Sequence, residues 1–243
     1  MNRWFAAFIG VVVGLAGIWG SAGTAAAKNA ATAPRTAGID GLAGIDVLID
    51  AGHGGIDGGT LYGDLTEKQI NLAVALNLFE RLRQSGLRVA LNRSKDYALS
   101  DDNRWLNSRS RHLRDLAQRK LVIDALKPRI TVSLHANWSA SPDRRGPSVL
   151  YKAGNPASAV AASVIQAQLN GLYGTRTRPH AGKTFYLLNR PASPAVIVEM
   201  GYISNPADRA MMTEPAGQNK IAEAIRSAIL QYLFVSDLCR LPT

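Results

Sequence analysis

The chain has little cysteine: Cys239, near the C-terminus, is the only one among 243 residues. A single cysteine excludes an intramolecular disulfide and a zinc site built on cysteines, so the fold must depend on its apolar core. The G-x-S-x-G motif of serine hydrolases is also absent from the sequence. Any bound metal must therefore be held by histidine and carboxylate side chains.

Acidic residues are few as well, with 18 Asp and Glu against 28 Lys and Arg and a net charge of +10. A basic chain favours anionic partners such as cell-wall polymers, lipid headgroups or nucleic acid. We expect a cell-wall or membrane surface and no nucleic acid, because the aromatic-basic interleaving typical of RNA binding is missing. Most of the cluster Arg104, Arg109, Arg111, Arg114 and Arg119 is interpreted as a solvated face, with a structural or substrate role for one member.

The N-terminus has the pattern of an export signal. Arg3 precedes an apolar stretch from Trp4 to Trp19, and Ala25-Ala26-Ala27 offers a cleavage site. The stretch is slightly short for a membrane-spanning helix, so residues 1–27 are either a cleaved signal peptide or an N-terminal anchor that uses residues 4–19. A buried helix of the domain is the alternative. The pattern predicts an exported, extracytoplasmic protein.

The rest of the chain divides into a linker over residues 28–44, a single catalytic domain over 45–235 and a tail over 236–243. Apolar runs predict strands at residues 45–51, 87–92, 130–135, 148–152, 185–188 and 195–198. Helical spacing predicts helices at 66–84, 104–126, 157–172 and 217–234. Strands that alternate with helices indicate an α/β layer fold with a largely parallel sheet.

Three ionisable side chains stand where predicted strands end: His53, His135 and Glu199. Open α/β sheets place their sites at the carboxyl ends of strands. Each histidine alone is more often an ordinary hydrogen-bonded residue, and Glu67 alone suits the first turn of a helix. Together, two imidazoles and one carboxylate, with a fourth position left to water, form an established catalytic zinc set.

Glu199 has two interpretations. It pairs with an arginine of the basic helix, or it acts as a general base beside the metal, because an apolar strand end raises the pKa of a carboxyl. His112, within the basic helix, is interpreted as a surface residue, and His180 as a loop residue without an assigned role.

Four blocks of the sequence carry a resemblance: VLIDAGHGGIDGG, LTEKQINLAVA, ITVSLHAN and PAVIVEMGYISNP. Between Asp46 and Tyr232 the chain resembles the zinc-dependent N-acetylmuramoyl-L-alanine amidases of the type-3 family. The resemblance implies that His53, Glu67 and His135 ligate Zn²⁺ and that Glu199 is the catalytic carboxylate. It also implies a mixed, mostly parallel central sheet flanked by helices.

Within this family the chain is similar to the germination-specific amidases of spore-formers. The similarity rests on its small size, the hydrophobic N-terminus, the segment Ser108–Arg119 and the ending after Tyr232. It implies cleavage of the amide between N-acetylmuramic acid and L-alanine of peptidoglycan stem peptides. It further implies a deacetylase that acts on the product, to form muramic-δ-lactam in the spore cortex.

Two rival functions are open at this point. One is another zinc-dependent cell-wall hydrolase, such as a glycan deacetylase, and the other is a wall-binding domain without catalysis. For the amidase reaction we expect the glycine-rich loop 54–63 and the segment 136–147 to border the groove, with Asn137 forming a hydrogen bond to the substrate.

Overall fold

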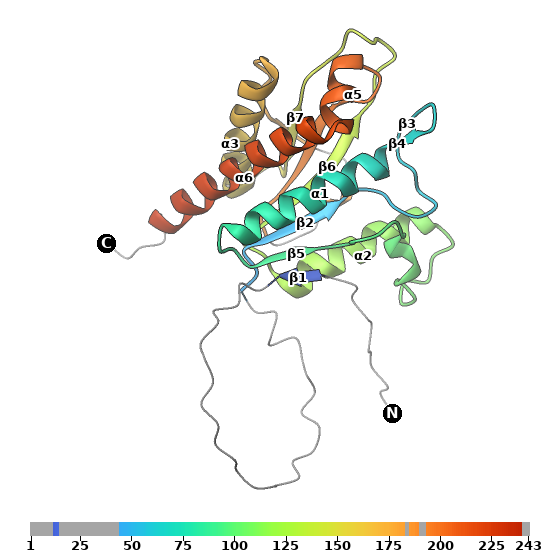
Figure 1. Cartoon of the computed structure of the whole chain (residues 1–243). Coiled ribbons are helices and arrows are strands. Elements are labelled where there is room, and N and C mark those ends of the chain that lie inside the picture. Colours follow the sequence, from blue (N-terminus) through green and yellow to red (C-terminus); the bar gives the residue numbers. More distant parts are fainter. Residues whose placement is uncertain (1–11, 15–43, 183–184, 190–192, 240–243) are drawn as a thin grey trace, which may run out of the picture.

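The computed structural model describes residues 12–14, 44–182, 185–189 and 193–239. These residues form a seven-stranded sheet with helices on both faces (Figure 1). In spatial order the strands are β1 (Val12–Gly14), β5 (Val89–Leu91), β2 (Val47–Ala51), β6 (Ile130–Asn137), β9 (Ala195–Tyr202), β7 (Ser148–Tyr151) and β8 (His180–Ala181). A small hairpin of β3 (Leu61–Tyr62) and β4 (Leu65–Thr66) lies apart from this sheet.

The centre of the sheet is parallel, because β5, β2, β6 and β9 all run in one direction. The strands at the two edges include antiparallel pairs: β1 is antiparallel to β5, and β7 is antiparallel to β9 but parallel to β8. The predicted fold class, a mixed and mostly parallel sheet flanked by helices, is confirmed. In the ladder between β6 and β9, His135 stands opposite Glu199.

The larger core lies on one face of the sheet, where apolar strand residues meet three long helices. These helices are α1 (Glu67–Gln84), α3 (Pro156–Tyr173) and α6 (Pro215–Leu238), and the short α5 (Pro206–Thr213) packs beside them. Small and branched side chains fill the contact; Val132 and Val198 of the strands and Ile225 of α6 are fully buried.

The opposite face is covered less completely, by α2 (Arg111–Leu126), α4 (Tyr186–Asn189) and the 3₁₀ turn η2 (Leu99–Asp101). A smaller core joins Leu48 of β2 to Val122 and Leu126 of α2. Towards the carboxyl ends of the strands this face turns polar, and Asp50 and Ser133 are buried there. The candidate site lies at this polar end.

The predicted elements differ from the structure in several places. Helix α2 begins at Arg111 and not at residue 104, because the Ser110 side chain accepts a hydrogen bond from the Leu113 N–H and caps the helix there. The predicted strand at 185–188 is wrong, since Tyr186–Asn189 is the helical turn α4. Helix α5 was not predicted. Strands β6 and β9 continue past His135 and Glu199 to Asn137 and Tyr202.

Most of the predicted leader (1–27) and linker (28–44) lies outside the described residues, as does part of the tail (236–243). Of the apolar stretch 4–19, Val12–Gly14 pairs with β5 at the edge of the sheet. Within the described ranges, no helix has the length and apolar character needed to cross a membrane. The leader, the linker and the tail therefore stay predictions.

Candidate active site

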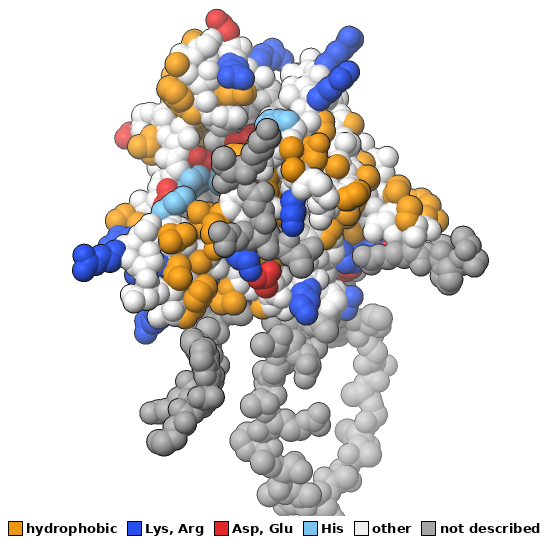
Figure 2. Space-filling model, turned by 180° about the vertical axis from the view of Figure 1, so that it is seen from behind, with side chains coloured by type: hydrophobic (Ala, Val, Ile, Leu, Met, Phe, Trp, Pro, Cys, Tyr) orange, Lys and Arg blue, Asp and Glu red, His pale blue; other side chains and the backbone are white. Residues whose placement is uncertain are grey.

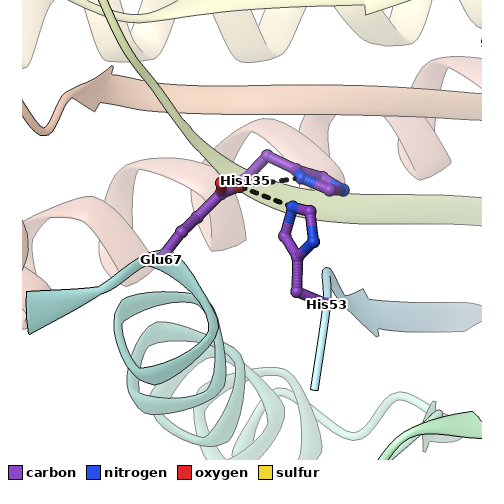
Figure 3. Close-up of side chains that lie close together, drawn as sticks. All are labelled: His53, Glu67 and His135. Atoms are coloured by element: carbon purple, nitrogen blue, oxygen red, sulfur yellow. Dashed lines mark hydrogen bonds and ion pairs between the residues drawn. The ribbon is translucent and has the colours of Figure 1, made fainter. Parts of the chain in front are cut away.

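Three side chains from different elements meet at the polar end of the sheet (Figure 3). His53 lies two residues after β2, Glu67 is the first residue of α1, and His135 belongs to β6. One nitrogen or oxygen atom of each lies within 4.8 Å of the others. The fold thus brings together the three residues that the sequence marked as metal ligands.

Glu67 is the centre of this cluster. Its Oε1 atom lies 2.9 Å from His135 Nδ1 and 3.2 Å from His53 Nε2. The Ala136 N–H donates to the same oxygen at 3.0 Å, and the Thr60 N–H donates to Oε2 at 2.9 Å. Burial raises the pKa of Glu67, but its contacts with the two histidines outweigh burial and hold the pKa well below its usual value. The carboxylate is therefore charged and fixed in one orientation.

His53 is oriented from its other side by Asp57. His53 Nδ1 lies 2.8 Å from Asp57 Oδ2, and the Gly59 N–H donates to Asp57 Oδ1 at 3.1 Å. Burial lowers the pKa of His53, but its hydrogen bonds to Asp57 and Glu67 outweigh burial and raise the pKa to about 9. A carboxylate on one ring nitrogen leaves the other nitrogen for a metal, an arrangement common around metal-binding histidines.

Two glycines let these side chains approach each other. A Cβ atom on Gly52 would lie 2.5 Å from His135 Nε2, and a Cβ atom on Gly59 would lie 2.6 Å from Glu67 Oε2. His53 itself has a φ of 60°, a left-handed conformation that non-glycine residues rarely adopt. Such strain persists only where the surrounding structure fixes the backbone.

Two buried arginines fix this part of the backbone. Arg93 donates to the carbonyls of Ala51 and Gly52, each at 3.0 Å. Arg119 donates to the carbonyl of Ala51 at 3.0 Å and to that of His53 at 2.8 Å. Three consecutive carbonyls therefore point to guanidinium groups, and Arg119 is the arginine of the basic cluster with a structural role.

Arg119 is 3% exposed, and its charge is balanced by two carboxylates. It lies 2.7 Å from Asp50 and 2.5 Å from Asp115. Asp50 also accepts hydrogen bonds of 2.5 Å from Asn92 and from Ser133. Burial raises the pKa of Asp50, but the charge of Arg119 and the Ser133 hydroxyl outweigh it and lower the pKa. This buried network lies directly beneath the His53 loop.

Glu199 lines the same cleft as the three clustered residues. Burial raises its pKa, and the nearby charge of Glu67 adds to this effect, while His135 and His53 oppose it. Among the described residues no arginine forms an ion pair with Glu199, which disfavours the interpretation of Glu199 as the partner of the basic helix. A partly buried carboxyl with a raised pKa suits proton transfer.

The cleft has a volume of about 660 Å³. Both predicted borders line it, through Asp57, Gly59 and Thr60 on one side and Ala136, Asn137 and Trp138 on the other. A third border, Phe185–Leu187, was not predicted. His112 is exposed and also lines the cleft, whereas His180 lies on β8, with its Nδ1 3.4 Å from Ser148 Oγ. Figure 2 shows histidine and acidic side chains together on this face, with hydrophobic side chains beside them.

Known amidases share this fold. The family model described as N-acetylmuramoyl-L-alanine amidase matches residues 47–231, which include all four candidate residues. The chain belongs to this family. It is therefore an enzyme, an N-acetylmuramoyl-L-alanine amidase that acts on peptidoglycan.

Three relatives place the chain within the family. It is 31% identical over 192 residues to the germination-specific N-acetylmuramoyl-L-alanine amidase of Bacillus subtilis (strain 168). The matched region covers 79% of this chain and 81% of that relative. The CwlD amidase of Clostridioides difficile, solved in complex with the GerS lipoprotein, has 31% identity and a TM-score of 0.73 over 79% of this chain and 99% of that one. The catalytic domain of CwlV from Bacillus (Paenibacillus) polymyxa var. colistinus has 33% identity and a TM-score of 0.66, with the same two coverages.

Proposed function

We propose that this amidase is zinc-dependent, with Zn²⁺ held by His53, Glu67 and His135 and with Glu199 as the general base. The supporting observation is the meeting of two imidazole nitrogens and one buried carboxylate oxygen within 4.8 Å. This donor set fits zinc, whereas magnesium, calcium and manganese favour sites richer in oxygen ligands. Asp57 on His53, and backbone N–H groups on Glu67, supply the outer hydrogen bonds that such a site needs.

The proposed reaction breaks the C–N bond between the lactyl carbonyl of N-acetylmuramic acid and the amine of L-alanine. When bound, zinc supplies Lewis acidity, which polarises a carbonyl and lowers the pKa of water towards ~7. Glu199 accepts a proton from the attacking water as the C–O bond forms. It then returns this proton to the nitrogen, so that the amine leaves as the C–N bond breaks. The raised pKa of Glu199 makes its carboxylate a better proton acceptor.

We further propose that the enzyme acts outside the cytoplasmic membrane, in formation of muramic-δ-lactam in the spore cortex. The similarity to a germination-specific amidase supports this role, and the N-terminal export pattern supports this location. A deacetylase would then remove the acetyl group from the peptide-free muramic acid. The freed amine would condense with the lactyl carboxyl and release water, which closes the lactam.

The test is digestion of purified peptidoglycan, followed by mass spectrometry of the products. A zinc amidase releases peptides that begin with a free L-alanine amine and leaves glycan with free lactyl carboxyls, and chelation stops the release. Released acetate with intact stem peptides would indicate a deacetylase, and binding without products would indicate a wall-binding domain. For the cortex role, the digested glycan is treated with a peptidoglycan deacetylase. Lactam should appear only after both enzymes have acted.

A further inference from the structure

The border of the cleft carries aromatic side chains that the fold leaves in solvent. Among the large apolar residues exposed within the described ranges, two line the main cleft: Trp138, which is 52% exposed, and Phe185, which is 39% exposed. Trp138 follows the end of β6, three residues after His135. At the rise of a strand this is roughly 10 Å from the candidate metal ligand.

The backbone around Trp138 is held firmly, although its indole ring is not used by the fold. The Trp138 N–H donates to Asn137 Oδ1 at 2.8 Å, and the Ser139 N–H donates to Ser204 Oγ at 3.1 Å. By contrast, Trp105 is similarly exposed, lies outside the cleft lining, and uses its indole N–H to bond Gln118 at 3.0 Å. For Trp138, no hydrogen bond of the indole N–H is found within the described part of the chain. A fixed backbone therefore presents a free indole face to the cleft.

Such a surface is suited to a rigid, partly apolar ligand. An indole offers a large contact area at little conformational cost, because only two side-chain torsions must be fixed. A pyranose ring has an apolar face of C–H groups and polar groups around its edge. Stacking of the two would cover the exposed indole and leave the sugar hydroxyls hydrated.

The chemistry of the substrate places such a ring on one side of the scissile bond. Only the lactyl group separates the sugar of N-acetylmuramic acid from the carbonyl that is attacked. The other side of the bond carries the stem peptide, which has carboxylates. The adjoining pocket of about 330 Å³ is lined by Arg111 and His112 but also by Asp57 and Asp115, and it contains neither Trp138 nor Phe185. This pocket carries charged groups of both signs and suits the charged, polar peptide, whereas the aromatic border suits the uncharged glycan.

We propose that Trp138 is a stacking platform for a pyranose ring of the glycan strand, beside Phe185, so that the enzyme reads the sugar as well as the peptide. This inference rests on the proposed amidase reaction, since it concerns the binding of the same substrate. It makes Trp138 a specificity-determining residue, with no part in bond cleavage.

The test compares two substrates that share the scissile amide. One is a stem peptide on a glycan strand, and the other is a D-lactyl-L-alanyl peptide without sugar. For Trp138→Ala, the ratio of kcat/KM between the glycan-bearing and the sugar-free substrate should fall about tenfold, mainly through KM. Trp138→Phe, which keeps an aromatic face, should recover most of this ratio. Trp105→Ala is the matched control, an exposed tryptophan removed from outside the cleft.

Direct binding gives a second measurement. Peptide-free glycan strands should change the tryptophan fluorescence of the wild type and of Trp105→Phe, but not of Trp138→Phe. Zinc content is measured in every variant, so that loss of the metal is recognised separately. If the wild type cleaves both substrates and Trp138→Ala leaves the ratio of their kcat/KM values unchanged, the proposed stacking role of Trp138 is wrong. A wild type that cleaves neither would instead contradict the proposed function.

Discussion

The Nη2 atom of Arg119 donates a hydrogen bond of 2.8 Å to the backbone carbonyl oxygen of His53. This contact joins the middle of α2 to the loop that carries a candidate zinc ligand. Because Arg119 also forms ion pairs with Asp50 and Asp115, the loop conformation depends on a buried set of charges. Stability and the shape of the site are therefore coupled at one side chain.

Replacement of Arg119 should therefore lower the stability of the protein and distort the candidate active site. Arg119→Met leaves Asp50 buried without its cationic partner, and breaking one side of such a pair costs about 3–5 kcal/mol of folding free energy. Urea unfolding at neutral pH measures this loss. Arg104→Met, which removes an exposed arginine from the same basic cluster, should change stability by less than about 0.5 kcal/mol. Equal stabilities for the two variants would show that the buried network contributes nothing.

Gly52 should tolerate no side chain, for a reason that concerns the metal site. Its φ is not in the left-handed region, but a Cβ atom would lie 2.5 Å from His135 Nε2. Gly52→Ala should therefore displace the imidazole and lower zinc affinity, by about 10–100-fold if the shift only disturbs orientation. Zinc competition with a chelator measures this affinity. Gly171→Ala, in α3 with nothing near the added methyl, should keep full affinity.

Variants of Glu199 and of His53 should distinguish loss of the catalytic rate from loss of the metal. Glu199→Gln keeps the shape of the side chain but cannot accept a proton, so we expect about one zinc per chain and a rate lower by ~10²–10⁴. His53→Ala should lose zinc and activity together. Metal analysis and the amidase rate on the same preparations check both.

Each alternative outcome for these variants has a definite meaning. Loss of zinc in Glu199→Gln would make Glu199 a ligand and would reduce Glu67 to an acid at a helix start. Full rate in Glu199→Gln would contradict the proposed base, and full zinc in His53→Ala would contradict the ligand set. His180→Ala, at an exposed histidine outside the lining of the cleft, is the control.

Asp50 predicts how stability depends on pH. The pKa of Asp50 in the folded protein is lowered below the usual value for aspartate, so its contribution to stability is fully present above that usual pKa and is lost as the pH falls through the folded pKa. The wild type should thus be more stable than Asp50→Asn near neutral pH, and the difference should narrow between about pH 5 and about pH 3. Urea unfolding of both proteins across this range measures the difference. A difference that widens with acid would contradict the lowered pKa.

The sequence predicts the central strands and long helices because each has a strong local signal. Residues 45–51 and 130–135 are apolar runs, and the capping box of Thr66 and Gln69 marks the start of α1, as the structure confirms. The strand predicted at residues 185–188 was wrong because a run of four apolar residues is too short to distinguish a strand from a helix by its periodicity. The helical form of this segment follows from tertiary packing, since Leu187 and Leu188 are buried against the sheet.

For the candidate site, glycine neighbours and strand ends indicated His53, His135 and Glu199. The supporting residues Asp57, Arg93 and Asp50 were not predicted, because their role depends on contacts across the fold. Arg93, for example, donates to carbonyls more than 40 residues earlier in the chain, at Ala51 and Gly52. No spacing within the sequence reports such a contact.

The pairing of His135 with Glu199 across β6 and β9 also limits how this enzyme can vary in length. Successive side chains of a strand alternate between the faces, and both Val198 and Met200 belong to the apolar core on the far side. One residue inserted within β9 before Glu199 would turn this carboxylate into that core. Two inserted residues would restore the face but shift the carboxylate by roughly 7 Å along the sheet. Insertions should therefore be tolerated only in the loops, where a change of chain length leaves the residue pairing between β6 and β9 unchanged.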